Sequence, residues 1–227
     1  MELNLKDRRP IATRNKSWAK NSARWLKNKG VTPNQISLAS IGCALISGLC
    51  FYTAFKFDGQ WLKTLFLTLA AVMIQGRLIC NLLDGMVAVE GGMSSAAGPV
   101  FNELPDRISD TLIFIGVGYG LHLFPFAATL GWSAALLALM TAYLRLLGAT
   151  CGLKQQFLGP MAKQHRMAAL FVVTILALFL PVTTGQWVLC ICLIIINIGT
   201  LITCWRRGKR ILDELLQQPL SQETTDE

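Results

Sequence analysis

The sequence predicts an all-α integral membrane protein with six transmembrane helices and an N-terminal cytoplasmic amphipathic helix. Of its 227 residues, 53% are hydrophobic and only 15% are charged, which is too apolar for an ordinary soluble domain. The apolar residues gather in runs close to the roughly 20 residues that cross the hydrocarbon core of a bilayer. Lys and Arg gather in the segments on one side of these runs, as the positive-inside rule describes.

The first 31 residues are basic and largely polar. Trp18, Trp25 and Leu26 fall on one helical face among Lys and Arg residues, a pattern typical of a helix that lies in the membrane interface. A disordered basic arm is the alternative. Thr32-Pro33-Asn34 follows and combines a capping side chain with a proline, so it predicts a helix start.

Six apolar runs follow this start. The second, third and fourth carry polar interruptions, so we expect them to face one another rather than lipid. The fifth is short. The runs centre on Ile36–Phe55, Leu65–Leu83, Val100–Tyr119, Ala127–Leu147, Ala168–Pro181 and Trp187–Cys204.

Charge placement predicts the orientation and the domain organisation. Basic residues are dense before the first run, after the last and between the fourth and fifth, whereas Lys56 and Lys63 with Asp58 are expected in the first loop on the other side. Both termini are therefore predicted to be cytoplasmic, in the inner (cell) membrane of a bacterium. The net charge of +8 is explained by topology and anionic lipid headgroups, not by nucleic acid. We divide the chain into an interfacial segment (1–31), a membrane catalytic domain (32–205) and a cytoplasmic tail (206–227).

Short polar side chains recur at helical spacing in the second and third runs. They are Arg77, Asn81 and Asp84, then Asn102, Asp106 and Asp110. The connection between them is short and rich in glycine, so the two helices should be antiparallel neighbours with both polar stripes near the cytoplasmic surface. Converging carboxylates in lipid indicate a site for a hard cation such as Mg²⁺ or Mn²⁺. A buried hydrogen-bonded network that only fixes helix packing is the alternative.

The spacing resembles the pattern D-x2-D-G-x2-A-R-x8-G-x3-D-x3-D of the CDP-alcohol phosphotransferases. The matching positions are Asn81, Asp84, Gly85, Ala88, Val89, Gly98, Asn102 and Asp106. The resemblance covers roughly residues 15 to 205 and includes the Thr-Pro-Asn-x-Ile-Ser sequence before the first run. In that family four acids hold two metal ions, which bind the pyrophosphate of a CDP-linked substrate.

Carried over by position, the resemblance implies that Asp84 and Asp106 are metal ligands and that Asp106 is also the catalytic base. Asn81 and Asn102 take the other two metal positions. The three small residues of the motif would lie against the CDP moiety: Gly85, Ala88 and Gly98. The resemblance also implies a homodimer.

Three motif positions depart from the pattern, and two of them remove a negative charge, at Asn81 and Asn102. Either one metal site is weakened, or other groups compensate. Candidate acids for that compensation are Glu90, Glu103 and Asp110. Asp110 lies one turn beyond Asp106, about 6 Å along the helix axis. Arg77 is a candidate to supply positive charge to a phosphate in place of a metal.

A second basic cluster contains Arg145, at the end of the fourth run, and Lys163 and Arg166 before the fifth. The resemblance implies that these residues line a pocket for the phosphate or headgroup of the acceptor. The alternative for Lys163 and Arg166 is that they only enforce topology.

The expected function is transfer of a phosphatidyl or phospho-alcohol group from a CDP-linked lipid donor, favoured to be CDP-diacylglycerol, to a small alcohol acceptor in phospholipid synthesis. A catalytically impaired relative that binds CDP-lipids or partner proteins stays open because of the two asparagines. A proton- or cation-coupled transporter is disfavoured, because the polar positions cluster near one end of two helices and not at the bilayer midplane.

Overall fold

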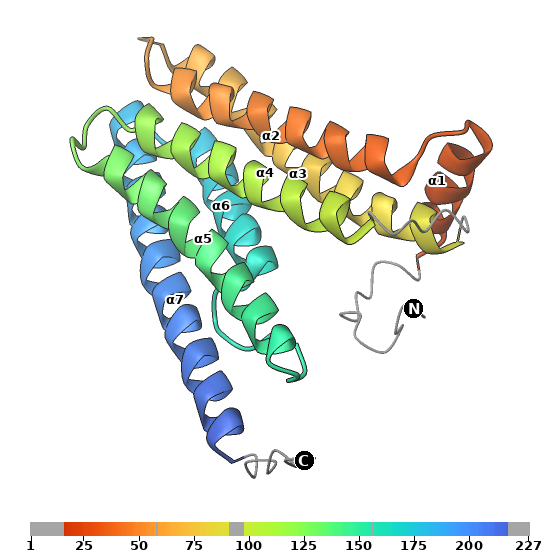
Figure 1. The fold of residues 1–227 in the computed structure, drawn as a ribbon. Coiled ribbons are helices and arrows are strands. Elements are labelled where there is room, and N and C mark those ends of the chain that lie inside the picture. Colours follow the sequence, from red (N-terminus) through yellow and green to blue (C-terminus); the bar gives the residue numbers. More distant parts are fainter. Residues whose placement is uncertain (1–15, 58, 91–97, 156, 218–227) are drawn as a thin grey trace, which may run out of the picture.

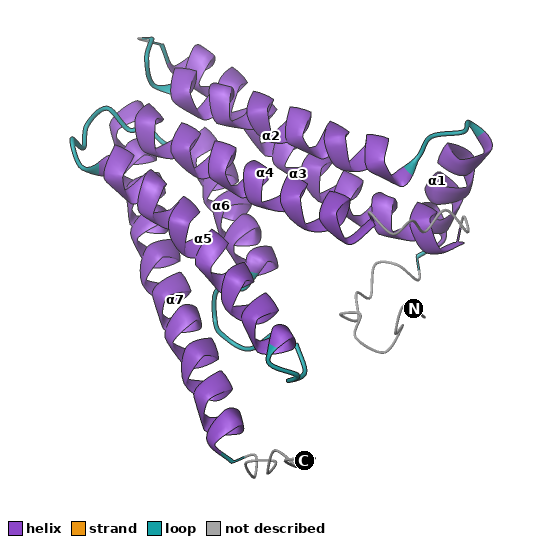
Figure 2. Cartoon of the chain, in the orientation of Figure 1, coloured by secondary structure: helices purple, strands orange, loops and turns teal. Residues whose placement is uncertain are grey.

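The computed structural model describes residues 16–57, 59–90, 98–155 and 157–217, and these residues form helices and loops only (Figure 2). The predicted all-α class is confirmed. The helices are α1 (Ser17–Asn28), α2 (Pro33–Ala54), α3 (Gln60–Glu90), α4 (Gly98–Gly120), α5 (Ala127–Thr150), α6 (Lys163–Leu178) and α7 (Val182–Leu216).

The helices form two groups, α2 to α4 and α5 to α7, with α1 across one end of the first group (Figure 1). α2 packs along both α3 and α4, α5 joins α4 to α7, and α6 joins α3 to α7. The backbones of α3 and α4, by contrast, make few close contacts with each other. Long side chains must therefore connect the two helices that carry the polar stripes.

Four helices, α2, α3, α5 and α7, are long and apolar enough to cross a membrane. The other two predicted spans fall on α4 and α6. α4 is set apart by four charged side chains within its first 13 residues: Glu103, Asp106, Arg107 and Asp110. α6 has only 16 residues, roughly 24 Å of helix, which is shorter than the roughly 30 Å hydrocarbon core.

The start of α2 is capped as the sequence predicts. The Thr32 backbone N–H donates to Oε1 of Gln35 at 2.9 Å, and the Gln35 backbone N–H donates to Oγ1 of Thr32 at 3.3 Å. Pro33 follows directly as the first helical residue, where its missing N–H costs nothing. This reciprocal cap fixes the point at which the chain enters the bundle.

Glycines set the spacing between α2, α4 and α5. A Cβ added to Gly116 of α4 would overlap the backbone of Gly48 of α2, and one added to Gly118 would lie 2.7 Å from the carbonyl oxygen of Ala127 of α5. Only glycine fits at such contacts between helix backbones. α4 is thereby held tightly against α2 and α5.

α1 packs on the end of α3 through its alanines. Ala19 and Ala23 are buried in a cluster with the last two turns of α3. Trp18 and Trp25 point away, with 42% and 60% of their surface exposed. The bundle therefore uses the small-residue side of α1 and leaves the tryptophan side uncovered.

Lys63 departs from the sequence-based expectation. It belongs to α3 and not to a loop, and it is fully buried. Its Nζ donates to the carbonyl oxygens of Ala177, at 2.8 Å, and Leu180, and Gln60 donates to Leu180 as well, at 3.0 Å. The ammonium thus satisfies carbonyls at the C-terminal end of the short helix α6.

Candidate functional site

Asp84 lies in the last two turns of α3 and is almost fully buried. Its Oδ2 accepts a hydrogen bond of 2.7 Å from the Ser37 hydroxyl of α2, and its Oδ1 accepts one of 2.5 Å from the backbone N–H of Gly85. Asp84 forms no ion pair with any described residue. Its charge is therefore held by neutral donors and stays available to a cation.

Arg77 lies two turns before Asp84 on α3 and reaches across to α4. Its Nη2 is 2.5 Å from Oδ1 of Asp110 and 3.5 Å from Oδ1 of Asp106, and the Arg77 side chain is fully buried. The two polar stripes predicted for α3 and α4 therefore meet through this guanidinium. Because the backbones of α3 and α4 are not in close contact, these ion pairs connect the two helices near Arg77.

The first turn of α6 supplies two more cations to the same acids. Lys163 Nζ pairs with Oδ2 of Asp106. Arg166 Nη2 lies 3.1 Å from Oδ2 of Asp110, and its Nη1 donates to the Met161 carbonyl at 2.9 Å. Both oxygens of each α4 carboxylate consequently face a basic side chain.

The resulting cluster has three acids and three bases from three helices: Asp84, Asp106 and Asp110 with Arg77, Lys163 and Arg166. The Asp84 and Asp106 carboxylates are close enough for their charges to interact, and the charge of Lys163 acts on Asp84 too. Within the described part of the chain, Nε and Nη1 of Arg77 and Nε of Arg166 are buried without a hydrogen-bond acceptor. These N–H groups favour an anion or an ordered water beside them.

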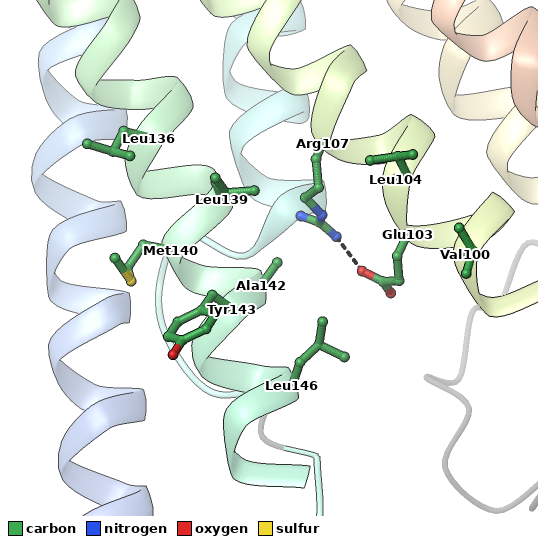
Figure 3. Close-up of a pocket in the computed structure, with 10 residues that line it drawn as sticks. All are labelled: Val100, Glu103, Leu104, Arg107, Leu136, Leu139, Met140, Ala142, Tyr143 and Leu146. Atoms are coloured by element: carbon green, nitrogen blue, oxygen red, sulfur yellow. Dashed lines mark hydrogen bonds and ion pairs between the residues drawn. The ribbon is translucent and has the colours of Figure 1, made fainter. Parts of the chain in front are cut away.

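Arg145 lies outside this cluster. It pairs with Glu103, which also accepts from Arg107 at 3.0 Å. Glu103 and Arg107 border a groove of about 550 Å³ between α4 and α5 whose other lining residues are almost all apolar (Figure 3). The Arg145 guanidinium also lies over the Phe157 ring, 5.7 Å from its centroid. The structure thus separates Arg145 from Lys163 and Arg166, with which the sequence had grouped it.

The remaining motif positions lie where α3 ends and α4 begins. Asn81 is one turn before Asp84, Gly85 and Ala88 follow it, and all three are partly buried. Gly98 is the first residue of α4. The connection at 91–97 and the side chains of Glu90 and Asn102 lie outside the described residues.

Two contributors were not predicted. Ser37 was noted only as part of the sequence before the first span, yet it holds Asp84; the hydroxyl five residues after a capping threonine was the available signal. Arg207 was interpreted as a topology signal. It is buried and donates to the carbonyls of Leu158 at 2.9 Å and Thr141 at 2.6 Å, which ties the segment before α6 to α5 and α7.

The donor set fits one hard cation better than two. Asp84 offers carboxylate oxygens, and Asn81, one turn away on the same helix, carries an amide oxygen, which is the ligand type that Mg²⁺ and Mn²⁺ take. Asp106 is different, because both of its oxygens already face side-chain cations. No cluster of three or more metal-binding side chains is found among the described residues.

These features define a class: a helical membrane protein whose site is a buried cluster of aspartates and basic residues. No family model matches the chain. It is 31% identical over 169 residues to the inner membrane protein YnbA of Escherichia coli strain K12, covering 72% of this chain and 76% of that protein. Over 88 residues it is 32% identical to the phosphatidylinositol phosphate synthase of Cutibacterium acnes, covering 38% and 37% of the two chains.

The fold of the chain is similar to that of solved structures. The phosphatidylinositol phosphate synthase PgsA1 of Mycobacterium tuberculosis in complex with manganese and citrate superposes with a TM-score of 0.71 at 19% identity, over 86% of this chain and 88% of that one. Its form with CDP-DAG bound superposes with a TM-score of 0.70 at 19% identity, over 85% and 92%. The chain belongs to the CDP-alcohol phosphotransferase family.

Proposed function

We propose that the protein is a membrane phosphotransferase that moves a phosphatidyl or phospho-alcohol group from a CDP-linked donor to an alcohol acceptor, with release of CMP. CDP-diacylglycerol is the favoured donor, since a similarly folded structure holds CDP-DAG and the site lies among apolar helices. The observation that carries the proposal is the pairing of Asp106 with Lys163 and Arg77, since Arg77 lies two turns before Asp84 on α3.

A divalent cation, Mg²⁺ or Mn²⁺, would be held by Asp84 with Asn81, and Asn102 is a further ligand by its place in the motif. When bound, such a cation neutralises charge on phosphoryl oxygens. Ser37 orients the Asp84 carboxylate toward that task through its 2.7 Å hydrogen bond. The small residues Gly85, Ala88 and Gly98 leave space for the CDP moiety.

Asp106 is the proposed base. It takes the proton of the acceptor hydroxyl while the acceptor oxygen bonds to the donor phosphorus and the bond from that phosphorus to CMP breaks. The Lys163 ammonium lies on one oxygen of Asp106 and holds the carboxylate in place beside the site. Lys163 can then contact a phosphate as the carboxylate becomes neutral.

Lys163 and Arg166 also form the proposed contact for the phosphate or headgroup of the acceptor. The buried N–H groups of Arg77 and Arg166 that lack an acceptor among the described residues support an anion here. Arg145 stands apart with Glu103. A role for Arg145 at the acceptor therefore requires its ion pair to open.

The membrane placement is part of the proposal. α4 and α6 complete six spans, because Asp110 of α4 is buried against basic side chains and Lys63 donates to a carbonyl in the last turn of α6. α1 lies in the cytoplasmic interface with Trp18 and Trp25 toward lipid. Both termini are cytoplasmic, the membrane is a bacterial inner membrane, and the chain forms a homodimer.

The test is CMP release by purified protein with CDP-diacylglycerol, Mg²⁺ or Mn²⁺ and a panel of alcohol acceptors that includes glycerol phosphate, inositol phosphate and serine. We expect CMP with one acceptor and its loss in both Asp84→Asn and Asp106→Asn. Lys209→Met, at an exposed position of α7, is the matched charge-removal control. Unchanged CMP release in the two aspartate variants would refute the assigned roles.

The second candidate is a relative that binds CDP-lipid without turnover. Asp106 favours it, since both of its oxygens already face basic side chains, Lys163 and Arg77, which leaves the carboxylate less free to contact an acceptor hydroxyl. Binding of CDP-diacylglycerol without CMP release for any acceptor in the panel would support this candidate over the transferase.

A further inference from the structure

Asp106 is contacted by charged groups and Asp84 by neutral ones, and this difference bears on metal binding. Asp106 has Lys163 on one oxygen and Arg77 at 3.5 Å from the other. Asp84 has a hydroxyl and a backbone N–H, which are neutral donors. One of the two motif carboxylates is therefore neutralised by the protein itself, and the other is not.

The motif has fewer acids in this chain than in the family pattern, and basic side chains lie beside the acids that remain. Asparagine stands at two of the four acid positions of the motif, Asn81 and Asn102. Asp110 does not replace them, because Arg77 and Arg166 occupy its two oxygens at 2.5 and 3.1 Å. A second dication next to Asp106 would meet ammonium and guanidinium groups with no unpaired carboxylate to offset them.

We infer that this site takes a single divalent cation, at Asp84, and that Lys163 with Arg77 takes the place of a second cation beside Asp106. The inference rests on the proposed function, because it assumes a diphosphate-linked substrate. It assigns Lys163 a role in substrate charge neutralisation in addition to any contact with the acceptor.

Charge balance supports this assignment. The charges of the three acids and three bases of the cluster cancel, so these six side chains contribute no net charge to the site. A pyrophosphate diester carries one negative charge on each phosphate, which a single dication offsets. Two dications would leave an uncompensated double positive charge in a buried site, a costly arrangement in low dielectric. A lysine ammonium is a mobile point charge suited to following a phosphate as it moves.

The stoichiometry of bound Mn²⁺ tests the inference directly on the full-length protein in detergent. Equilibrium dialysis with metal analysis, with and without CDP, should give one Mn²⁺ per chain, and its electron paramagnetic resonance spectrum should lack the dipolar coupling of a metal pair. Asp84→Asn should abolish binding. Two Mn²⁺ per wild-type chain, or one that survives Asp84→Asn, would overturn the inference.

A variant pair tests the part played by Lys163. Asn81→Asp combined with Lys163→Met restores a carboxylate and removes the ammonium, so it should raise the stoichiometry from one to two. Asn81→Asp combined with Lys209→Met leaves Lys163 in place and should stay at one. If both double variants bind one Mn²⁺, Lys163 does not stand in for a cation.

Failure of this inference is distinguishable from failure of the proposed function. CMP release by a protein that binds two Mn²⁺ would leave the transferase proposal standing and remove the inference. One bound Mn²⁺ without CMP release from any donor and acceptor would remove the transferase proposal and leave only the single-cation count standing. The wild-type stoichiometry decides the matter even where a double variant does not fold.

Discussion

Arg77 of α3 and Asp110 of α4 form an ion pair of 2.5 Å between side chains that are 0% and 1% exposed. Arg166 of α6 lies on the other oxygen of the same carboxylate, at 3.1 Å. One buried aspartate therefore joins three helices, two of which have few close backbone contacts. This carboxylate is positioned to hold the cluster together.

Removing one partner of this triad should destabilise the fold. Asp110→Asn leaves two buried guanidiniums without their shared charge, and breaking a buried pair in this way costs about 3–5 kcal/mol. We expect a lower midpoint for thermal unfolding in detergent, followed by circular dichroism. Arg210→Met removes an exposed pair with Glu214 on α7 and should cost under about 1 kcal/mol. Equal losses in the two variants would contradict a structural role for Asp110.

The hydroxyl of Ser37 should matter to the site more than to the fold. Ser37→Ala removes the 2.7 Å hydrogen bond to Asp84, and loss of a partner that orients a metal ligand typically lowers affinity or activity about 10- to 100-fold. The measurement is the Mn²⁺ dissociation constant together with CMP release. Ser47→Ala, on the same helix, removes a buried hydroxyl that donates to Ala70 at 3.1 Å and is the matched control. The prediction fails if both variants bind Mn²⁺ alike.

The contact of α2 with α4 predicts a sharp difference between two glycines. Gly116→Ala places a Cβ against the backbone of Gly48, whereas a Cβ on Gly42 of α2 meets nothing within 4 Å. Overpacking against a backbone costs typically about 1–3 kcal/mol, and Gly→Ala in an open helix gains up to about 1 kcal/mol. Thermal unfolding should therefore fall for Gly116→Ala and hold or rise for Gly42→Ala. A Gly116→Ala variant as stable as wild type would show that the two helices can move apart.

Much of the fold was predictable because apolar runs of membrane length and the spacing of polar residues are local features of the sequence. The Thr32 cap and the all-α class follow from such local signals, and they are confirmed. The pairing of Asp106 with Lys163 was not predictable. It joins residues that are 57 positions apart on helices α4 and α6, and no spacing rule connects them. Sequence spacing placed Arg77 and Asp110 on facing stripes but did not predict their ion pair.

Lys63 is a second residue whose partners could not be predicted from the sequence. A lysine at the edge of an apolar run is ordinarily assigned to a loop, because a buried ammonium without partners is expensive. Here its partners are the carbonyls of Ala177, in the last turn of α6, and of Leu180, just after the helix, where the end of the helix leaves carbonyls without intrahelical donors. Those partners lie at the end of another helix, so the sequence around Lys63 does not predict them.

This arrangement gives Lys63 a role in holding the C-terminal end of the short helix α6. Lys63→Met should leave the Ala177 carbonyl without its donor, at about 1–3 kcal/mol for a buried group left unpaired. The Leu180 carbonyl keeps its hydrogen bond from Gln60, and α6 should loosen from α3. Thermal unfolding measures the loss, and hydrogen exchange of the amides of α6 locates it. Lys56→Met removes an exposed lysine that lies over the Tyr52 ring at 5.3 Å, so it should change neither quantity. Full protection of the α6 amides in Lys63→Met would mean that the helix end is held by its own packing, and the capping role assigned to the ammonium would be wrong.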